Sequence, residues 1–404
     1  MMRVLIVDNS CVLEVNQRKW VELAKHKDIE VLILVPRVWI SDIDKERYSH
    51  QSNSTNPKLV VAGDVFFPGA CNRYFFRNNF VKTLQIFHPD IIFVDTEPGN
   101  PSVLQFTLLA KLFGAKLLFS AVENNPQGSI PGIKRLARTL MEAIVFRGSE
   151  CAIALSKDAK NLLRRKGFKK SIKVIPFPTD SDHFHSMHVR DLKEKFGLKD
   201  FVIGYLGRLS KEKGLLSLIR AIAKLKKEDA NFTLLLVGEG ILRHEIEALA
   251  DELGVREKIR FTGAVPHHDA PRYLNCMDLL VLPSVTMPYW KEQFGRVLIE
   301  AMACEIPVLG SNSGEIPNVI EKTGGGLIFK EGDVEELKEK ILLLMRDENL
   351  RRRLAKRGRV SVTSRFSYVV VTQEIRRVLL SVLSQRKSIG RHGHKKPGEH
   401  DRTK

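Results

Sequence analysis

The sequence predicts an α/β protein built from two doubly wound domains that follow each other along the chain. The chain has 404 residues, 43% of them apolar, which suits two domains that each bury a core. Short apolar runs without clean alternation recur between amphipathic helical stretches, a pattern typical of parallel sheets covered on both faces. This alternation of strands and helices is interrupted once, at Pro176 and Pro178, and then resumes.

The two halves carry comparable sets of elements. In the first half we expect strands at 3–8, 30–35, 91–95, 116–122, 151–155 and 172–175, and helices at 12–26, 103–113 and 134–146. In the second half we expect strands at 201–206, 232–237, 258–261, 279–282, 307–309 and 326–329, and helices at 215–227, 245–253 and 334–346. The domains are therefore expected at 1–175 and 176–367. A last helix at 368–383 should pack back on the first domain, before a disordered basic tail at 385–404.

Composition limits the classes of protein. The five cysteines are scattered, odd in number and without a CxxC pair, which favours a reduced cytosolic protein without disulfides or a zinc site. The chain opens on a short apolar run typical of a first strand rather than a signal peptide, and no run is long enough to span a bilayer. The net charge of +18 indicates either a polyanionic partner or simple solubility. Motifs typical of nucleic-acid binding are missing, so we expect no nucleic-acid partner.

The first chemical motif follows the strand at 201–206. Gly207 allows close approach of a ligand to the backbone at the carboxyl end of that strand, where open α/β sheets bind ligands. Arg208 and Lys213 add two cations just before a helix N-terminus, a natural site for a diphosphate. An exposed basic turn is the alternative.

The second motif follows the strand at 279–282. Glu292 lies in a loop, and Glu300 lies about a turn into the next helix, so the two carboxylates can bracket a ligand at the helix N-terminus. One can accept the hydroxyl hydrogens of a ribose, and the other can hold a sugar hydroxyl. The amides of Phe294, Gly295 and Arg296 can point at the ligand. The alternative is that Glu300 lies on a solvated helix face.

Other features of the sequence are weaker. Gly207, Gly238, Gly263 and Gly310 each closely follow a strand, which indicates either a ligand cleft at one sheet edge or ordinary turns. The segment 180–182 matches a DxD metal motif but is better explained as an Asx turn, and the histidines are interpreted as surface residues. Residues 97–100, which include Glu97, follow a strand and form a candidate acceptor site.

The sequence resembles the retaining glycosyltransferase family 4, which includes bacterial phosphatidylinositol mannosyltransferases and sucrose synthase. The resemblance is specific over 175–321 and weaker before that range. Its most specific part is the pair of glutamates eight positions apart, with Phe-Gly soon after the first of them. The segments that carry it are 207–214, 237–240, 261–265, 282–284 and 292–304. The resemblance implies a GT-B fold, in which two Rossmann-like domains face a central cleft.

The resemblance also implies roles for individual residues. Arg208 and Lys213 resemble the pair that neutralises the donor diphosphate. Glu300 resembles the ribose-binding carboxylate, and Glu292, with the amides after it, resembles the group that faces the transferred sugar. Val265 resembles the position whose backbone meets the base.

Three positions depart from the family pattern. Members often have a glycine-rich loop after the first strand, but residues 9–17 contain no glycine. Many carry a histidine near the cleft after the strand at 116–122, where this chain has Glu123, so either Glu123 takes that role or the catalysis differs. Glu305 stands where a glycine is usual.

The resemblance implies hexosyl transfer from a UDP- or GDP-linked sugar, without a cofactor or metal. The leaving diphosphate would be stabilised by Arg208, Lys213 and helix dipoles, and it would help to deprotonate the acceptor during front-face attack with retention. We expect a glycan or lipid-linked acceptor and a cytoplasmic location. The alternative within this fold is a nucleotide-sugar epimerase or hydrolase. The basic amphipathic helix at 134–147 either packs into its domain or docks on an anionic membrane surface.

Overall fold

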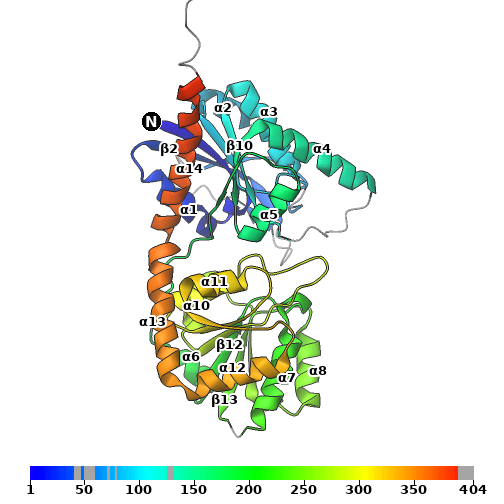
Figure 1. Cartoon of the computed structure of the whole chain (residues 1–404), viewed down its shortest axis with the longest axis vertical. Coiled ribbons are helices and arrows are strands. Elements are labelled where there is room, and N and C mark those ends of the chain that lie inside the picture. The colour runs from blue at the N-terminus through cyan, green and yellow to red at the C-terminus, as the bar shows by residue number, and fades with distance from the viewer. Residues whose placement is uncertain are drawn as a thin grey trace, which may run out of the picture.

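The structure is a computed structural model in which two α/β domains are stacked along the long axis of the molecule (Figure 1). It describes residues 1–40, 47–49, 60–70, 73–77, 80–124, 132–228 and 230–389, with the backbone alone described for 385–389. The described chain has the two parallel sheets of the GT-B fold, as expected from the sequence. Within it, no helix has the length and apolar character needed to cross a membrane.

The N-terminal sheet has seven parallel strands in the order β11-β10-β9-β8-β1-β2-β5. Their residues are mostly β-branched or Leu and are buried on both faces, which explains why they lack alternation. The strands are β1 (Met2–Val7), β2 (Ile29–Pro36), β5 (Val60–Gly63), β8 (Ile91–Val94), β9 (Lys116–Ala121), β10 (Ser149–Ala154) and β11 (Ser171–Val174). Six were expected, whereas the edge strand β5 was missed.

Helices cover both faces of this sheet. One face packs against α2 (Val81–Phe87), α3 (Pro101–Phe113), α4 (Gly132–Gly148) and α5 (Lys157–Arg165). The other face packs against α1 (Glu14–Ala24) and α14 (Tyr368–Ile389), which contribute Trp20, Leu23, Val371, Ile375 and Leu379. Two small antiparallel hairpins were not expected: β3 (Val38–Ile40) with β4 (Arg47–Ser49), and β6 (Val65–Phe66) with β7 (Phe75–Phe76).

The C-terminal sheet has six parallel strands in the order β14-β13-β12-β15-β16-β17. The strands are β12 (Phe201–Leu206), β13 (Phe232–Val237), β14 (Ile259–Gly263), β15 (Leu279–Leu282), β16 (Val308–Ser311) and β17 (Gly326–Phe329). The helices are α6 (Arg190–Lys195), α7 (Leu215–Lys226), α8 (Arg243–Glu252), α9 (Ala270–Leu274), α10 (Arg296–Ala303), α11 (Ile316–Thr323), α12 (Val334–Arg346) and α13 (Glu348–Arg365). The strand order reverses between β12 and β15, so a ligand crevice is expected where the loops after these two strands diverge.

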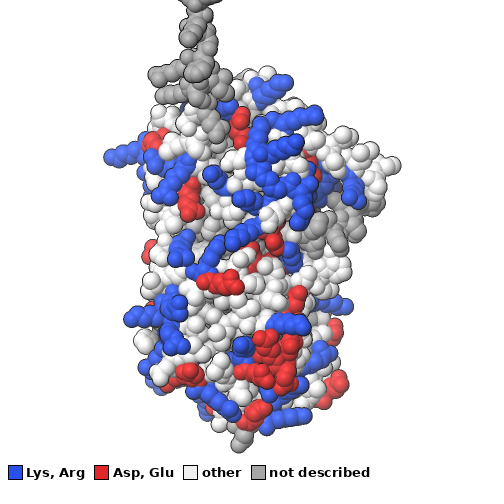
Figure 2. Space-filling model, in the orientation of Figure 1, with Lys and Arg blue, Asp and Glu red and all other residues white. Residues whose placement is uncertain are grey.

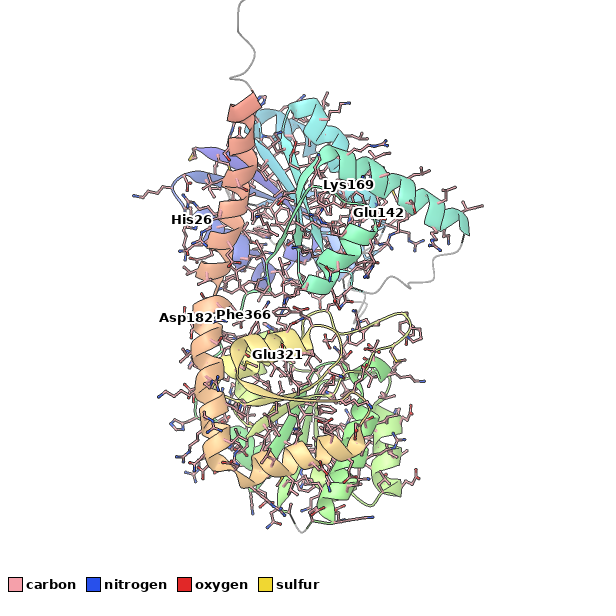
Figure 3. All side chains as sticks on the ribbon, in the orientation of Figure 1. His26, Glu142, Lys169, Asp182, Glu321 and Phe366 are labelled. Atoms are coloured by element: carbon pink, nitrogen blue, oxygen red, sulfur yellow. The ribbon has the colours of Figure 1, made fainter. Side chains whose placement is uncertain are left out.

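The chain crosses between the domains twice, and the two crossings touch. The first runs through Pro176 to Asp180, and the second follows α13 at Phe366, which Figure 3 labels near Asp182 at the junction. The amide of Thr179 donates a hydrogen bond to the carbonyl of Phe366 at 2.7 Å, and Thr179 pairs with Ser367 in a parallel bridge. Helix α14 continues to Ile389, so residues 385–389 are helical rather than part of a disordered tail. The remainder of the expected tail, 390–404, lies outside the described residues.

Candidate active site

The loop after β12 carries the two cations that the sequence singles out. Gly207 follows the strand, and its amide donates to the carbonyl of Val237 at 3.0 Å. The Arg208 side chain is 55% exposed and lies 3.8 Å from Glu212, so its guanidinium is accessible at the crevice. The Lys213 ammonium is only 14% exposed and lies 4.7 Å from the centre of the Trp290 ring. Arg208 is thus accessible, whereas Lys213 is enclosed.

Lys213 and Glu292 form one ion pair. The Lys213 Nζ lies 2.7 Å from Glu292 Oε2, and the hydroxyl of Ser284 donates to the same oxygen at 2.7 Å. Glu292 is 7% exposed, and a carboxylate buried to this extent needs a cation or hydrogen-bond donors nearby. Lys213, expected to bind the diphosphate, and Glu292, expected to face the sugar, therefore lie side by side at the switch point of the sheet.

Two glycines hold the loop of Glu292 in place. Gly214 has φ 66°, and a Cβ there would lie 1.9 Å from the carbonyl oxygen of Pro283. Gly314 has φ 56°, and a Cβ there would lie 1.9 Å from the carbonyl oxygen of Glu292. No residue with a side chain fits either position without moving the backbone, because the conformation and the space both exclude a Cβ. The loops after β12, β15 and β16 therefore pack directly against one another.

Glu300 lies inside the protein. It is 5% exposed, and its Oε1 lies 3.1 Å from Nε2 of His267. The alternative of a solvated helix face is therefore wrong. Glu300 lines a cavity of about 180 Å³, together with Arg18, Asp180, His183, Phe184, His267, His268, Arg296 and Tyr368 among others.

His267 is a candidate site residue that the sequence interpretation missed. It was taken as a surface residue, and its side chain is indeed 47% exposed, but it contacts Glu300 in this cavity. Its position shortly after Val265, the residue expected to meet the base, is the signal that could have found it. Val265 itself is half-buried and packs against the C-terminal core.

The start of α10 combines packing with available amides. Phe294 is 4% exposed, with its ring 5.6 Å from that of Phe177, so its side chain belongs to the junction between the domains. Gly295 has φ 74°, and the Arg296 guanidinium lies 4.6 Å from the centre of the Phe177 ring. Within the described chain, none of the three amides of residues 294–296 donates a hydrogen bond, which leaves them available to a ligand.

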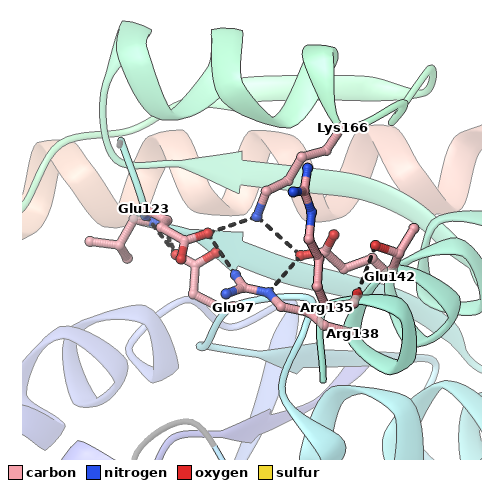
Figure 4. Close-up of polar contacts among 8 residues, drawn as sticks. Glu97, Glu123, Arg135, Arg138, Glu142 and Lys166 are labelled. Atoms are coloured by element: carbon pink, nitrogen blue, oxygen red, sulfur yellow. Dashed lines mark hydrogen bonds and ion pairs between the residues drawn. The ribbon is translucent and has the colours of Figure 1, made fainter. Parts of the chain in front are cut away.

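Glu123 lies across the junction, just after β9. Its Oε2 accepts from Arg138 Nη2 and from Lys166 Nζ, both at 2.7 Å (Figure 4). Burial raises the pKa of Glu123, but the charges and hydrogen bonds of Lys166 and Arg138 outweigh burial and hold that pKa below its usual value. Its neighbour Asn124, which the sequence interpretation missed, donates from Nδ2 to the carbonyl of Glu292 at 2.9 Å. Asn124 thus links the two halves of the candidate site.

The segment 180–182 forms the Asx turn that the sequence favoured over a metal motif. The amide of Asp182 donates to Asp180 Oδ1 at 3.2 Å, and Asp180 also forms an ion pair with Arg18 of α1. This turn lies at the first crossing between the domains, where it also lines the cavity of Glu300.

A family model matches most of the C-terminal domain. Residues 190–361 match the family model of the glycosyl transferases group 1, so they form a domain of that family. This range contains Arg208, Lys213, Glu292 and Glu300. The match confirms the resemblance seen in the sequence over these residues, and the two-sheet architecture is that of the GT-B fold.

Two curated relatives are named glycosyltransferases. The 2-deoxystreptamine glucosyltransferase of Streptomyces kanamyceticus is 28% identical over 229 residues, which are 55% of this chain and 58% of that protein. The capsular polysaccharide biosynthesis glycosyltransferase CapM of Staphylococcus aureus is 28% identical over 305 residues, 73% of this chain and 78% of that one. The match to the first relative thus spans little more than half its length.

A solved structure supports the fold over nearly the whole chain. HepE of Anabaena, crystallised with UDP and glucose, superposes with a TM-score of 0.72 at 21% identity, covering 94% of this chain and all of HepE. The two-domain GT-B architecture therefore extends beyond the matched family domain into the N-terminal half.

Proposed function

We propose that the protein is a glycosyltransferase that moves a hexosyl group from a nucleotide sugar to a separate acceptor. The observation that carries this proposal is the buried Lys213–Glu292 ion pair at the switch point of the family-matched sheet. Its carboxylate, Glu292, lies on the loop just before α10, whose first amides are available, and the loops around the pair are held by glycines. A cation, a carboxylate and free amides are the groups that a diphosphate joined to a sugar requires.

The donor is a UDP- or GDP-linked sugar, bound without a metal or other cofactor. Arg208 and Lys213 neutralise the diphosphate, and Glu300 accepts the ribose hydroxyl hydrogens inside its cavity. Glu292 and the amides of residues 294–296 face the sugar, and the backbone at Val265 meets the base. The crystal of HepE with UDP and glucose supports nucleotide-sugar binding on this fold.

Transfer proceeds with retention of configuration at the anomeric carbon. The acceptor attacks on the face that the diphosphate leaves, which preserves the configuration, while Arg208 and Lys213 stabilise the charge on the leaving diphosphate. The acceptor enters from the N-terminal domain and is a polysaccharide or a lipid-linked glycan. The name of CapM, a capsular polysaccharide enzyme, supports the first type of acceptor.

An anionic membrane surface is the proposed docking partner, from the cytoplasmic side. Helix α4 leaves one apolar face exposed, formed by Ile133 (88% exposed), Leu136 (61%), Leu140 (58%) and Ile144 (45%). Helix α4 does pack on its domain, through Val145 in the N-terminal core, but this apolar face stays exposed. Lys134 and Arg135 are exposed next to it, and Figure 2 shows Lys and Arg side chains gathered over the N-terminal domain. An exposed apolar face flanked by cations suits the interface of an acidic bilayer.

Thermal shift with a panel of nucleotide sugars tests the proposal. A UDP- or GDP-linked sugar at about 100 times its Kd should stabilise the fold by roughly 2.7 kcal/mol. The Arg208→Ala variant should lose most of this shift. The control Lys224→Ala, which changes a cation paired with Glu335 away from the site, should keep it. A panel with no shift would contradict the proposal.

Two rival functions give different results in the same assays. A nucleotide-sugar epimerase or hydrolase of this fold would consume its donor equally fast with and without an acceptor. A nucleic-acid-binding protein would bind a DNA duplex with strong dependence on salt. We expect neither result, because the candidate site offers the groups that bind a diphosphate and it faces a second domain.

A further inference from the structure

The loop between β15 and α10 contains a tight hairpin at residues 287–290, on the side of the C-terminal domain that faces the N-terminal domain (Figure 1). The amide of Met287 donates to the carbonyl of Trp290 at 2.7 Å, and the amide of Trp290 donates to the carbonyl of Met287 at 3.2 Å. Before the hairpin, the amide of Val285 donates to the carbonyl of Glu212 at 2.9 Å. The hairpin is therefore a fixed element that adjoins the loop after β12.

Trp290 contacts the cation that is proposed to bind the diphosphate. The centre of its ring lies 4.7 Å from Nζ of Lys213, within the range at which the face of an aromatic ring attracts a cation. This attraction is strongest for Trp and for a cation that is partly removed from water, and the Lys213 side chain is only 14% exposed. Glu292 Oε2 lies 2.7 Å from the same ammonium. Two neighbours thus hold the ammonium, and its remaining side is available to a ligand.

The N-terminal domain holds the two residues that follow the hairpin. Lys291 forms an ion pair with Asp158, in the first turn of α5. The carbonyl of Glu292 accepts a hydrogen bond from Nδ2 of the buried Asn124 at 2.9 Å. The ring of Trp290 and these two contacts belong to three successive residues, so the N-terminal domain fixes the end of the hairpin from outside the proposed donor site.

We propose that Trp290 is a positioning residue for the donor diphosphate, held in place by the N-terminal domain through Lys291 and Glu292. The proposal rests on the function proposed above and deepens it. The ring keeps the Lys213 ammonium in one place, with its open side toward the diphosphate. Loss of the contacts to the N-terminal domain loosens the hairpin and weakens the binding of the diphosphate by Lys213. Donor affinity therefore depends on Asp158 and Asn124, which lie in the other domain.

The first experiment compares side chains at position 290 in the full-length chain, by calorimetry with UDP and GDP. Trp290→Phe keeps the face of a ring, so the Kd of the nucleotide that binds should stay within about threefold of the native value. Trp290→Leu keeps apolar bulk without a ring face, and its Kd should be roughly tenfold higher. The control is Tyr289→Leu, which removes an exposed aromatic ring of the same hairpin and should keep the native Kd.

The second experiment follows Trp290 itself by ¹⁹F NMR, after labelling with 5-fluorotryptophan. The chain has three tryptophans, and the signal that Trp290→Phe removes is that of Trp290. The nucleotide that binds should shift this signal and leave those of Trp20 and Trp39, which are buried in the N-terminal domain, in place. A residue that serves only to pack the loop would not respond to the nucleotide.

The third experiment changes the N-terminal domain alone. Asp158→Asn breaks the ion pair with Lys291, so it should shift the Trp290 signal without nucleotide and raise the nucleotide Kd about threefold. The control Glu150→Gln breaks another ion pair of the same domain, with Lys116, and should change neither.

Two kinds of result overturn the proposal while the proposed function stands. One is a nucleotide Kd in Trp290→Leu equal to that of the native chain or of Trp290→Phe. The other is a Trp290 signal that a bound nucleotide does not shift, or a native Kd in Asp158→Asn. If neither nucleotide nor any nucleotide sugar binds to the native chain, the proposed function fails first and the proposal fails with it.

Discussion

Glu305 has φ 62°, a left-handed conformation that favours glycine. It follows the last turn of α10, where its amide donates to the carbonyl of Met302 at 3.0 Å and the amide of Ile306 donates to that of Ala301 at 3.0 Å. These two bonds form a Schellman motif, whose left-handed position usually carries glycine. The structure thus explains why a glycine is usual at this position in the family that the sequence resembles.

Glu305→Gly should therefore stabilise the protein by about 1 kcal/mol, because the strain of a side chain in the left-handed region is removed. Denaturant unfolding of the two proteins measures the difference. Glu305→Ala is the control, since it removes the charge and keeps the strain, and it should gain little. An equal gain in both variants would attribute the effect to the charge instead.

Because Lys213 is paired with Glu292 and Arg208 is not, replacing the two cations should have different effects on stability. Arg208→Ala should leave the fold intact and lower catalytic efficiency on the order of 10- to 100-fold, the value of one charge-assisted bond to a diphosphate. Lys213→Ala should lower activity similarly and also destabilise the fold by about 3 kcal/mol, because Glu292 is left buried without its cation. Adding Glu292→Gln should restore stability but not turnover. Near-normal turnover in the double variant of Arg208 and Lys213 would remove the diphosphate assignment.

Replacing the two glutamates of the second motif should affect different steps, nucleotide binding in one case and turnover in the other. Glu300→Ala should mainly weaken nucleotide binding, because a ribose contact exists in the ground state and in the transition state alike. Glu292→Ala should lower turnover more than nucleotide affinity. Calorimetry with UDP and GDP separates the two effects. Loss of nucleotide binding in Glu292→Ala, with normal binding in Glu300→Ala, would show that the roles are reversed.

At the scale of elements, the sequence predicted twelve of the thirteen strands of the two large sheets, because each is an apolar run between turn residues. It missed the edge strand β5 and both hairpins, and the hairpin strands, of two or three residues, are too short to show a period. It identified the loops after β12 and β15 because each carries charged residues between a strand and the N-terminus of the next helix. It could not find the Asn124–Glu292 contact or the partners of Glu123, because these join positions far apart in the chain.

The packing of the loops after β15 and β16 gives a prediction at this scale. Gly314→Ala should displace the carbonyl of Glu292 and so lower both stability and donor affinity, since its Cβ would lie 1.9 Å from that oxygen. Gly332→Ala is a matched control, with φ 77° and open space around the added Cβ. The control should cost only the backbone strain, about 1 kcal/mol. Equal donor affinity in the two variants, measured by calorimetry, would contradict the proposed coupling.

At the scale of the whole molecule, the charge and the exposed apolar face of α4 predict membrane attachment. Liposome flotation should show binding to vesicles with acidic lipid, weaker binding at high salt, and weaker binding when the residues after Ser384 are removed. The double variant Leu136→Glu, Leu140→Glu should lose binding. The control Ile241→Glu changes an apolar residue of the other domain that is more exposed still, at 88%, and should keep binding. Equal binding to neutral vesicles would favour a soluble acceptor.

Helix α14 gives the N-terminal domain a core that the first half of the chain cannot complete. Val371, Ile375 and Leu379 cover the same face of the sheet as Trp20 and Leu23. During synthesis, the strands up to β11 leave the ribosome well before this helix, by roughly 10 to 40 s at about 5–20 residues per second. For that interval one face of the first sheet lacks part of its cover, while the second domain can already fold behind it. The domain that is made first is thus the one that is finished last, and a nascent chain stopped before Tyr368 would hold a complete second domain beside an unfinished first one.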